Sequence, residues 1–134
     1  MDTSVFIYQV QANPRYQPFT DMVFSWLEQS GVAAVTSTIT MTELLVRPYR
    51  EKDEHWVRGY YALLSKYPNL QWIAPDLEIA DVAARIRARH RLRTPDAILA
   101  ATATAAGAPA LITNDEIFER VETFETLVLE RLLT

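Results

Sequence analysis

The sequence predicts a single α/β domain whose sheet is largely parallel. Short apolar runs alternate with stretches of helical spacing along the whole chain, which is the order expected of successive strand–helix units. The 134 residues suit one hydrophobic core, and no repeat, low-complexity tract or linker divides them. Hydrophobic residues make up 49% and charged residues 22%, a balance typical of a globular chain. We therefore expect one domain over residues 1–134.

The composition excludes several classes of site. The chain has no cysteine, which rules out disulfides, thiolate metal sites and a cysteine nucleophile. Its two histidines, His55 and His90, are too few and too far apart in sequence to suggest a zinc site. No apolar run is long enough to span a membrane, and no signal peptide is visible. The sequence thus predicts a cytoplasmic protein without a membrane partner.

Two helices are predicted in the first quarter of the chain. Asp2, Thr3 or Ser4 can cap a short helix that runs to about Val10. Residues 19–29 place apolar side chains at helical spacing, and a Ser-Gly pair follows them.

A strand and a third helix follow. Residues 32–36 are small or β-branched, as in a short buried strand. Thr40 and Glu43 match the capping box, in which two side chains satisfy the first free N–H groups of a helix. The helix that begins there is expected to end at Pro48, whose ring disrupts a helix interior.

The middle of the chain continues the alternation of helices and strands. Residues 51–66 carry aromatic and leucine side chains on one side of a helix, and residues 70–74 form a short apolar strand. A further helix begins at Pro75-Asp76 and ends near Arg91.

The clearest helix start in the chain is a Thr-Pro-Asp triplet. Thr94 suits the N-cap, Pro95 suits the first helical position, and Asp96 falls in the first turn at the positive end of the helix dipole. A run of alanines lets this helix pack closely on a sheet, and Gly107 ends it. Three predicted elements remain: a strand over 110–113, a short helix over 116–120 and a strand over 126–129.

Four isolated carboxylates fall at helix starts or just after strands: Asp2, Glu43, Asp96 and Asp115. Each has a structural explanation of its own. Asp2 and Asp115 can cap helices, and Glu43 can complete the capping box. Asp96 suits the positive end of its helix.

The shared location of these four residues favours a metal site. The carboxyl ends of parallel strands meet at one edge of a sheet, where ligand sites form, and Asp2 would join this edge if a strand preceded it. Carboxylates gathered in one cleft repel one another, and Mg²⁺ or Mn²⁺ would relieve that repulsion because hard cations take oxygen ligands. Such a site suits phosphoester hydrolysis. No Ser–His–Asp arrangement, Walker loop or glycine-rich dinucleotide motif offers an alternative.

Positive charge is concentrated in one stretch, although the net charge of −4 opposes bulk binding to nucleic acid. Arginines occupy every second position from 85 to 93: Arg85, Arg87, Arg89, Arg91 and Arg93. One interpretation is a solvated helix face. The other is a patch that contacts phosphates or that an acidic partner covers.

Four segments resemble, in order, the conserved blocks of PIN-domain ribonucleases. The best match is to the small single-domain toxins of VapBC-type toxin–antitoxin pairs. The segments are residues 2–7 (DTSVFI), 42–45 (TELL), 94–100 (TPDAILA) and 111–115 (LITND). Each block is short, but four in the right order across nearly the whole chain form a specific pattern.

The resemblance implies a three-layer α/β/α sandwich with a mostly parallel sheet. It implies an endoribonuclease that depends on Mg²⁺ or Mn²⁺ and acts as the toxin of a toxin–antitoxin module. The expected partners are an RNA substrate such as transfer RNA, an antitoxin protein that masks the site, and a second copy of the chain in a homodimer.

The resemblance also assigns roles to residues of this sequence. Asp2 and Asp96 would be the firmest metal ligands, and Glu43 would complete the acidic cluster. Asp115 would bind or position a second metal or the attacking water. Three further residues would hydrogen-bond to the ligands: Thr3, Thr113 and Asn114. Three arginines would contact RNA: Arg87, Arg91 and Arg93.

One feature departs from the family pattern. Family members carry several apolar residues before the first aspartate, forming the first and central strand, whereas here only Met1 precedes Asp2. Either the start lies upstream, or the chain is shortened, or the sheet tolerates the missing strand. Without that strand, Asp2 is expected to be poorly held, with the α-amino group nearby.

Two other functions stay open on the sequence. A PIN-like fold kept for binding RNA or protein, without catalysis, would explain the abrupt start. A receiver domain of the response-regulator type fits the length, but it needs a lysine after a late strand, and the only lysines are Lys52 and Lys66.

Overall fold

The computed structural model describes residues 1–133, and the sequence prediction of an α/β domain is confirmed. The last residue of the predicted domain, Thr134, lies outside the described residues. In chain order the elements are α1 (Thr3–Val10), α2 (Gln17–Leu27), β1 (Ala34–Ser37), α3 (Thr38–Arg50), α4 (Glu54–Lys66), β2 (Leu70–Ile73), α5 (Leu77–Arg89), α6 (Thr94–Ala105), β3 (Ala110–Thr113), the 3₁₀ helix η1 (Glu116–Arg120), β4 (Glu125–Val128) and α7 (Leu129–Leu132). None of the helices within residues 1–133 is long and apolar enough to cross a membrane.

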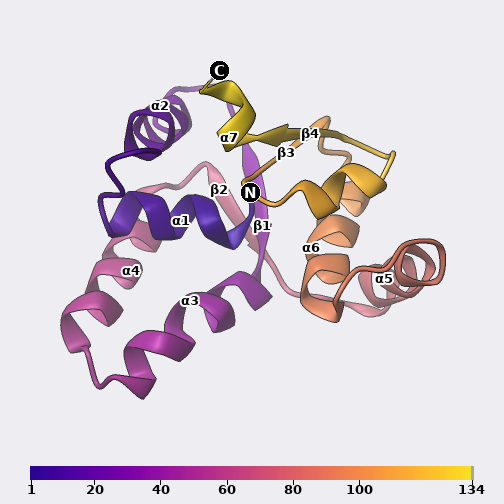
Figure 1. Ribbon diagram of the computed structural model, residues 1–134, viewed down its shortest axis with the longest axis horizontal. Helices are drawn as coiled ribbons and strands as arrows, with labels where there is room; N and C mark the ends of the chain where they lie inside the picture. The colour runs from indigo at the N-terminus through magenta and orange to yellow at the C-terminus, as the bar shows by residue number, and fades with distance from the viewer. Residues whose placement is uncertain (134) are drawn as a thin grey trace.

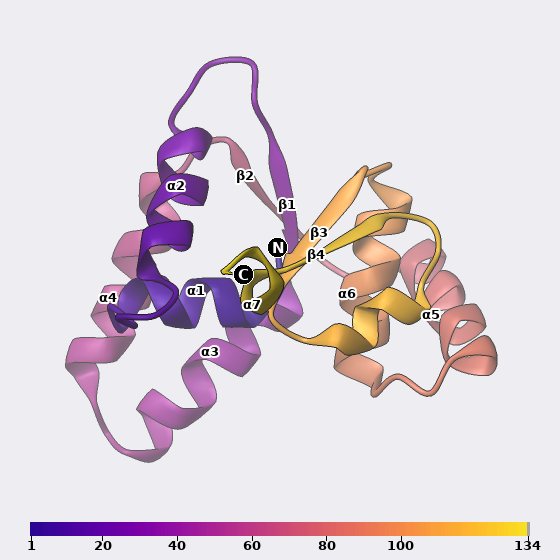
Figure 2. The same ribbon diagram turned by 45° about the horizontal axis from the view of Figure 1, so that its top comes forward.

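The strands form two parallel pairs that lie between two groups of helices (Figure 1). β1 pairs with β2, and β3 pairs with β4, both in parallel register. Helices α1 to α4 cover one side, and α5 and α6 cover the other, as the second view also shows (Figure 2). This arrangement is the predicted α/β/α sandwich with a parallel sheet.

Met1 and Asp2 bridge the two strand pairs. The Met1 amino group donates to the Val35 carbonyl oxygen of β1 at 2.9 Å, and the Asp2 N–H donates to the Ile112 carbonyl oxygen of β3 at 2.9 Å. The described residues contain no strand before α1. The acidic residue at position 2 is therefore held between the two halves of the sheet.

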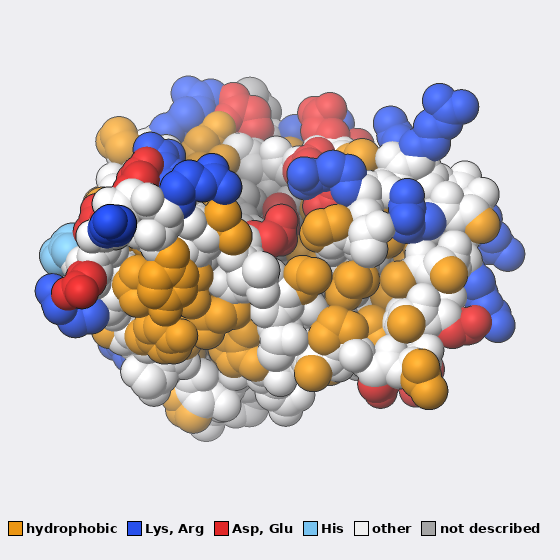
Figure 3. All heavy atoms as spheres, turned by 90° about the horizontal axis from the view of Figure 1, so that it is seen from below, with side chains coloured by type: hydrophobic (Ala, Val, Ile, Leu, Met, Phe, Trp, Pro, Cys, Tyr) orange, Lys and Arg blue, Asp and Glu red, His pale blue; other side chains and the backbone are white. Residues whose placement is uncertain are grey.

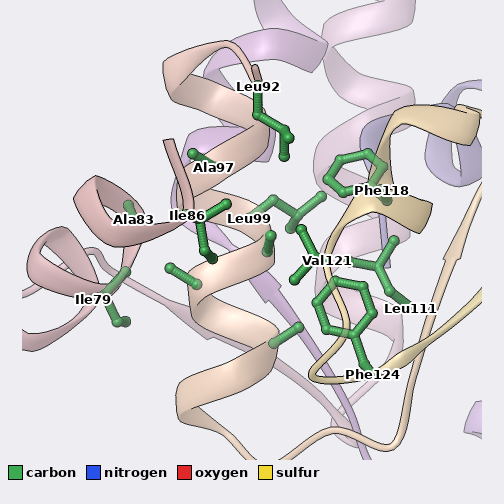
Figure 4. Packing of buried hydrophobic residues seen from close by; sticks show 13 residues of the cluster. Ile79, Ala83, Ile86, Leu92, Ala97, Leu99, Leu111, Phe118, Val121 and Phe124 are labelled. Carbon is green, nitrogen blue, oxygen red and sulfur yellow. The ribbon is translucent and has the colours of Figure 1, made fainter. Parts of the chain in front are cut away.

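Each group of helices has its own hydrophobic core. One core joins α5 and α6 to β3 and η1, with Ile86, Leu99 and Phe118 at its centre (Figure 4). Four alanines of α6 are buried there, Ala97, Ala100, Ala101 and Ala103, which confirms that this helix packs closely against its neighbours. The other core joins α1 to α4 around Phe6, Phe24 and other buried side chains, and Phe6 and Phe24 meet edge to face at 5.8 Å. The two cores fix the two sides of the site described below.

The start of α3 differs from the prediction. Ser37, not Thr40, is the N-cap, because its hydroxyl accepts the Ile39 N–H at 3.2 Å and the helix begins two residues before Thr40. Thr40 is buried and its hydroxyl is hydrogen-bonded to that of Thr36 at 3.1 Å. The capping box between Thr40 and Glu43 is therefore wrong, and the Glu43 side chain is left for another partner.

Two other helix boundaries also differ from the prediction. α3 continues past Pro48 to Arg50, so the proline lies in the last turn, where few helical bonds remain to be disrupted. The Pro48 carbonyl oxygen accepts the Asp53 N–H at 2.8 Å. α6 begins at Thr94, and Arg93 is its N-cap, in an extended conformation without a side-chain capping bond. Thr94 instead accepts a hydrogen bond from Arg87 at 3.0 Å.

Candidate functional site

The four predicted carboxylates line one cavity at the carboxyl edge of the strands. Its volume is about 530 Å³. Figure 3 shows acidic side chains in a central hollow on this side of the molecule, with arginines beside them. The lining residues are Asp2, Thr3, Ser4, Ile7, Tyr8, Glu43, Arg93, Asp96, Asn114, Asp115 and Glu116. Segments from four parts of the chain therefore meet at one place.

Asp2 is firmly held at the N-cap of α1, contrary to the expectation from the sequence. Its carboxylate accepts from the Thr3 N–H at 2.7 Å, the Thr113 hydroxyl at 2.7 Å and the Ser4 hydroxyl at 3.2 Å. Asp2 is only 8% exposed, and this burial raises the pKa of its carboxyl above the ordinary value, against the effect of the three hydrogen bonds. The side chain is oriented, and its negative charge is poorly solvated.

Glu43 reaches the same cavity from the second turn of α3. The Thr3 hydroxyl donates to its carboxylate at 2.9 Å. Desolvation raises the pKa of Glu43, and the nearby charges of Asp2 and Asp96 raise it further. The bond to Thr3 takes the place of the predicted capping bond and links α1 to α3 at the edge of the site.

Asp96 lies in the first turn of α6 and is 7% exposed. Its partner is Arg93, whose Nε donates to Oδ2 at 3.1 Å and whose Nη2 is 3.5 Å from Oδ1. The Asp96 side chain is thus buried at the positive end of a helix, with one guanidinium against it.

Asp115 caps a helix, as its position just after a predicted strand suggested. It is the N-cap of η1, and its carboxylate accepts the Ile117 N–H at 3.0 Å. Its own N–H donates to the Thr113 hydroxyl at 2.9 Å. Since Asp115 also lines the cavity, capping and a place at the site are compatible.

The predicted supporting residues divide into two groups. Thr3 and Thr113 each hold a carboxylate of the site, as described above. Asn114 does something else: its Nδ2 donates to the Tyr8 hydroxyl at 3.0 Å, and its Oδ1 accepts the Glu130 N–H at 2.8 Å. It fastens the end of β3 to α1 and α7 rather than bonding to a carboxylate.

Sequence reasoning missed three polar residues of the cavity, Ser4, Tyr8 and Glu116. Ser4 bonds to Asp2 from two positions along the chain, a local pattern that could have indicated it. Tyr8 reaches the site only because α1 and the end of β3 lie together, which no short sequence pattern reveals.

Of the three arginines predicted to contact RNA, the cavity includes only Arg93. Arg87 braces the loop before α6, donating to the Leu92 carbonyl oxygen at 3.1 Å and to Thr94. The carbonyl oxygen of Arg91 accepts from Arg120 at 3.1 Å. Contact of these arginines with RNA stays a prediction.

The chemistry of the cavity fits a hard divalent cation. Its donors are carboxylate and hydroxyl oxygens, and a cation would relieve the crowding of charge that raises the pKa of Asp2 and Glu43. Within residues 1–133, no three acidic or histidine side chains lie close enough together to hold one ion as they stand. The carboxylates surround a common cavity without closing on one point.

The fold is that of an α/β domain with parallel strands, and its cavity is lined by carboxylate and hydroxyl oxygens. A family model described as "PIN domain" matches residues 1–123. The chain therefore belongs to the PIN domain family, as the four sequence blocks predicted.

Solved structures with the same fold include two toxin–antitoxin complexes. One is VapBC2 from Rickettsia felis bound to a DNA fragment from their promoter, with a TM-score of 0.71 at 16% identity over 94% of each chain. The other is a toxin–antitoxin complex from Klebsiella pneumoniae, with a TM-score of 0.69 at 23% identity over 96% of this chain and 94% of that chain. At these identities the likeness shows the fold. A search of curated proteins found no match.

Proposed function

We propose that this protein is a metal-dependent endoribonuclease that hydrolyses RNA phosphodiester bonds. The observation that carries the proposal is the meeting of Asp2, Glu43, Asp96 and Asp115 around one cavity, on a chain of the PIN domain family. Mg²⁺ or Mn²⁺ bound there would polarise the phosphate, lower the pKa of a water and stabilise the leaving oxygen.

The residues of the cavity divide the work. Asp2 and Asp96, the two buried carboxylates, would hold the ion, and Glu43 would complete the set. Thr3 and Thr113 keep two of these carboxylates oriented through their hydroxyls. Asp115, two residues after the end of β3, would orient a water or a second ion. Arg93 and the arginines before α6 would contact RNA phosphates.

We also propose that the protein is the toxin of a toxin–antitoxin pair. The support is that both solved structures described above are toxin–antitoxin assemblies with this fold over nearly the whole chain. The expected partner is a cognate antitoxin that covers the cavity, and we keep the homodimer, the transfer RNA substrate and the cytoplasmic location as predictions.

The substitution Asp96→Asn tests the nuclease. It removes one charge and leaves the side chain the same size, so the fold should persist. Cleavage of RNA in Mg²⁺ or Mn²⁺ should fall by at least about 100-fold, because the site loses a ligand for the ion that would stabilise the transition-state charge. Asp81→Asn is the matched control, because Asp81 is exposed on α5 and pairs with Arg85. Undiminished cleavage by the Asp96 variant would refute the assignment.

A second candidate function is a binding module without catalysis. The observation that favours it is the pairing of Asp96 with Arg93, together with carboxylates that do not converge on one point in the described residues. If the parent chain binds RNA or an antitoxin but cuts no RNA at any Mn²⁺ concentration, this alternative is preferred.

A further inference from the structure

Among the described residues that line the cavity, Arg93 is the only basic one. Its guanidinium folds back three positions along the chain onto Asp96, with Nε 3.1 Å from Oδ2. The two side chains differ sharply in exposure: that of Arg93 is 72% exposed and that of Asp96 is 9% exposed. A solvated cation thus lies against a buried anion.

Asp96 is not the only carboxylate that Arg93 influences. The hydrogen bond that Arg93 donates to Asp96 is the main reason that the pKa of Arg93 is raised, and the charges of Glu43 and Asp115 contribute as well. Reciprocally, Arg93 opposes the rise in the pKa of Glu43. Three of the four carboxylates therefore face the same guanidinium charge.

This inference rests on the metal site of the proposed function. We propose that Arg93 is a built-in counter-ion that occupies the Asp96 carboxylate while no divalent cation is bound and gives it up when the cation arrives. Arg93 and the ion then compete for the same oxygen atoms, and this competition lowers the apparent affinity of the site for the ion.

The exposure of Arg93 makes the exchange possible. Ion pairs with one well-solvated partner contribute little stability, so the guanidinium leaves at small cost. A divalent cation at Asp96 would also repel the guanidinium, which drives Arg93 outward toward solvent. In the absence of the ion, Arg93 prevents the full repulsion among the carboxylates.

The test is a calorimetric titration with Mn²⁺ of the parent chain, Arg93→Ala and Arg89→Ala. Both variants lose one positive charge, but Arg89 is exposed near the end of α5 and does not line the cavity. Because exposed ion pairs are weak, we expect Arg93→Ala to bind Mn²⁺ about two- to fivefold more tightly than the parent. Arg89→Ala should bind like the parent, and Arg93→Lys should fall between.

Thermal unfolding gives a second readout that does not depend on RNA cleavage. In a chelator, Arg93→Ala should melt at a lower temperature than the parent, because its carboxylates lose their counter-ion. Saturating Mn²⁺ should remove that deficit, so the ion-induced rise in melting temperature is larger for the variant. Arg93 provides no side-chain capping bond to α6, so the truncation removes no cap.

The outcomes separate this inference from the proposed function. Mn²⁺ binding by Arg93→Ala that is equal to or weaker than the parent's would overturn the competition, and weaker binding would mean that Arg93 orients Asp96 for the ion. If the parent binds Mn²⁺ and Asp96→Asn does not, the metal site stands whatever Arg93 does. If the parent binds no Mn²⁺ at all, both proposals fall.

Discussion

The Asp2 carboxylate is held by three hydrogen bonds, but its burial outweighs them. The cost of desolvating this charge lowers the stability of the unliganded protein. The pKa of Asp2 is raised above the ordinary value of 3.8, so the folded chain binds a proton at pH values where the unfolded chain does not. The free energy of unfolding therefore falls as the pH rises from that value through the pKa of the folded state. Glu43 contributes with the same sign, from its ordinary value of 4.5 upward.

Asp2→Asn should accordingly stabilise the metal-free protein at neutral pH, by about 1 kcal/mol, the usual size of such a gain. The amide can still accept the Thr3 N–H, and the hydroxyls of Ser4 and Thr113 can rotate to accept from it. Denaturation in a chelator at about pH 5 and about pH 8 measures the effect, which should be larger at the higher pH. A variant less stable than the parent at both pH values would contradict this account.

Individual residues also show how much of the site could be predicted from the sequence. The four acidic positions followed from local helix and strand patterns. The parallel sheet predicted that Glu43, Asp96 and Asp115 meet, whereas Asp2 joins them without a preceding strand, through its bonds to Ile112 and Thr113 of β3. The capping box at Thr40 was wrong because Ser37 competes for the same helix start, and both residues suit a cap. The link between Arg93 and Asp96 was missed because an arginine beside a helix start has many possible partners.

Among the elements, the end of β3 depends on Asn114. The residue joins three segments, through its bond to Tyr8 of α1 and its acceptance of the Glu130 N–H in α7. It thereby sets the position of Thr113, which holds Asp2, and of Asp115. No periodic pattern in the sequence predicts such a junction, because the partners lie 106 and 16 positions away.

Asn114→Ala should destabilise the fold by about 1–2 kcal/mol, because the α7 N–H and the Tyr8 hydroxyl each lose a partner. Asn114→Asp should cost less, since a carboxylate oxygen can still accept the Glu130 N–H. The midpoint of urea denaturation, compared for the two variants and the parent, provides the measurement. An unchanged midpoint for the alanine variant would show that the junction is not needed.

At the scale of the whole molecule, the site is lined by residues from both helix groups, and each group has its own hydrophobic core. The alternating order of elements was enough to predict helices on both sides of a parallel sheet. The division into two strand pairs was not predictable in detail, since it depends on how Met1 and Asp2 fit between Val35 and Ile112.

If the cavity binds Mn²⁺ through carboxylates from both sides, the ion should slow amide hydrogen exchange in both cores. Asp96 belongs to the side of α5 and α6, and Glu43 to the side of α1 to α4. Exchange measured by mass spectrometry should therefore slow in peptides from α3 and from α6 together. Protection confined to one side would mean that the ion uses ligands from that side alone.

The bridge made by Met1 and Asp2 has a mechanical consequence. The two helix groups are joined there by these backbone hydrogen bonds and by side-chain bonds from Thr113 to Asp2 and from Asn114 to Tyr8, and the carboxylates lie on both sides of this junction. An ion bound to carboxylates from both helix groups would therefore fasten the two sides of the molecule together at the point where Met1 and Asp2 already join them.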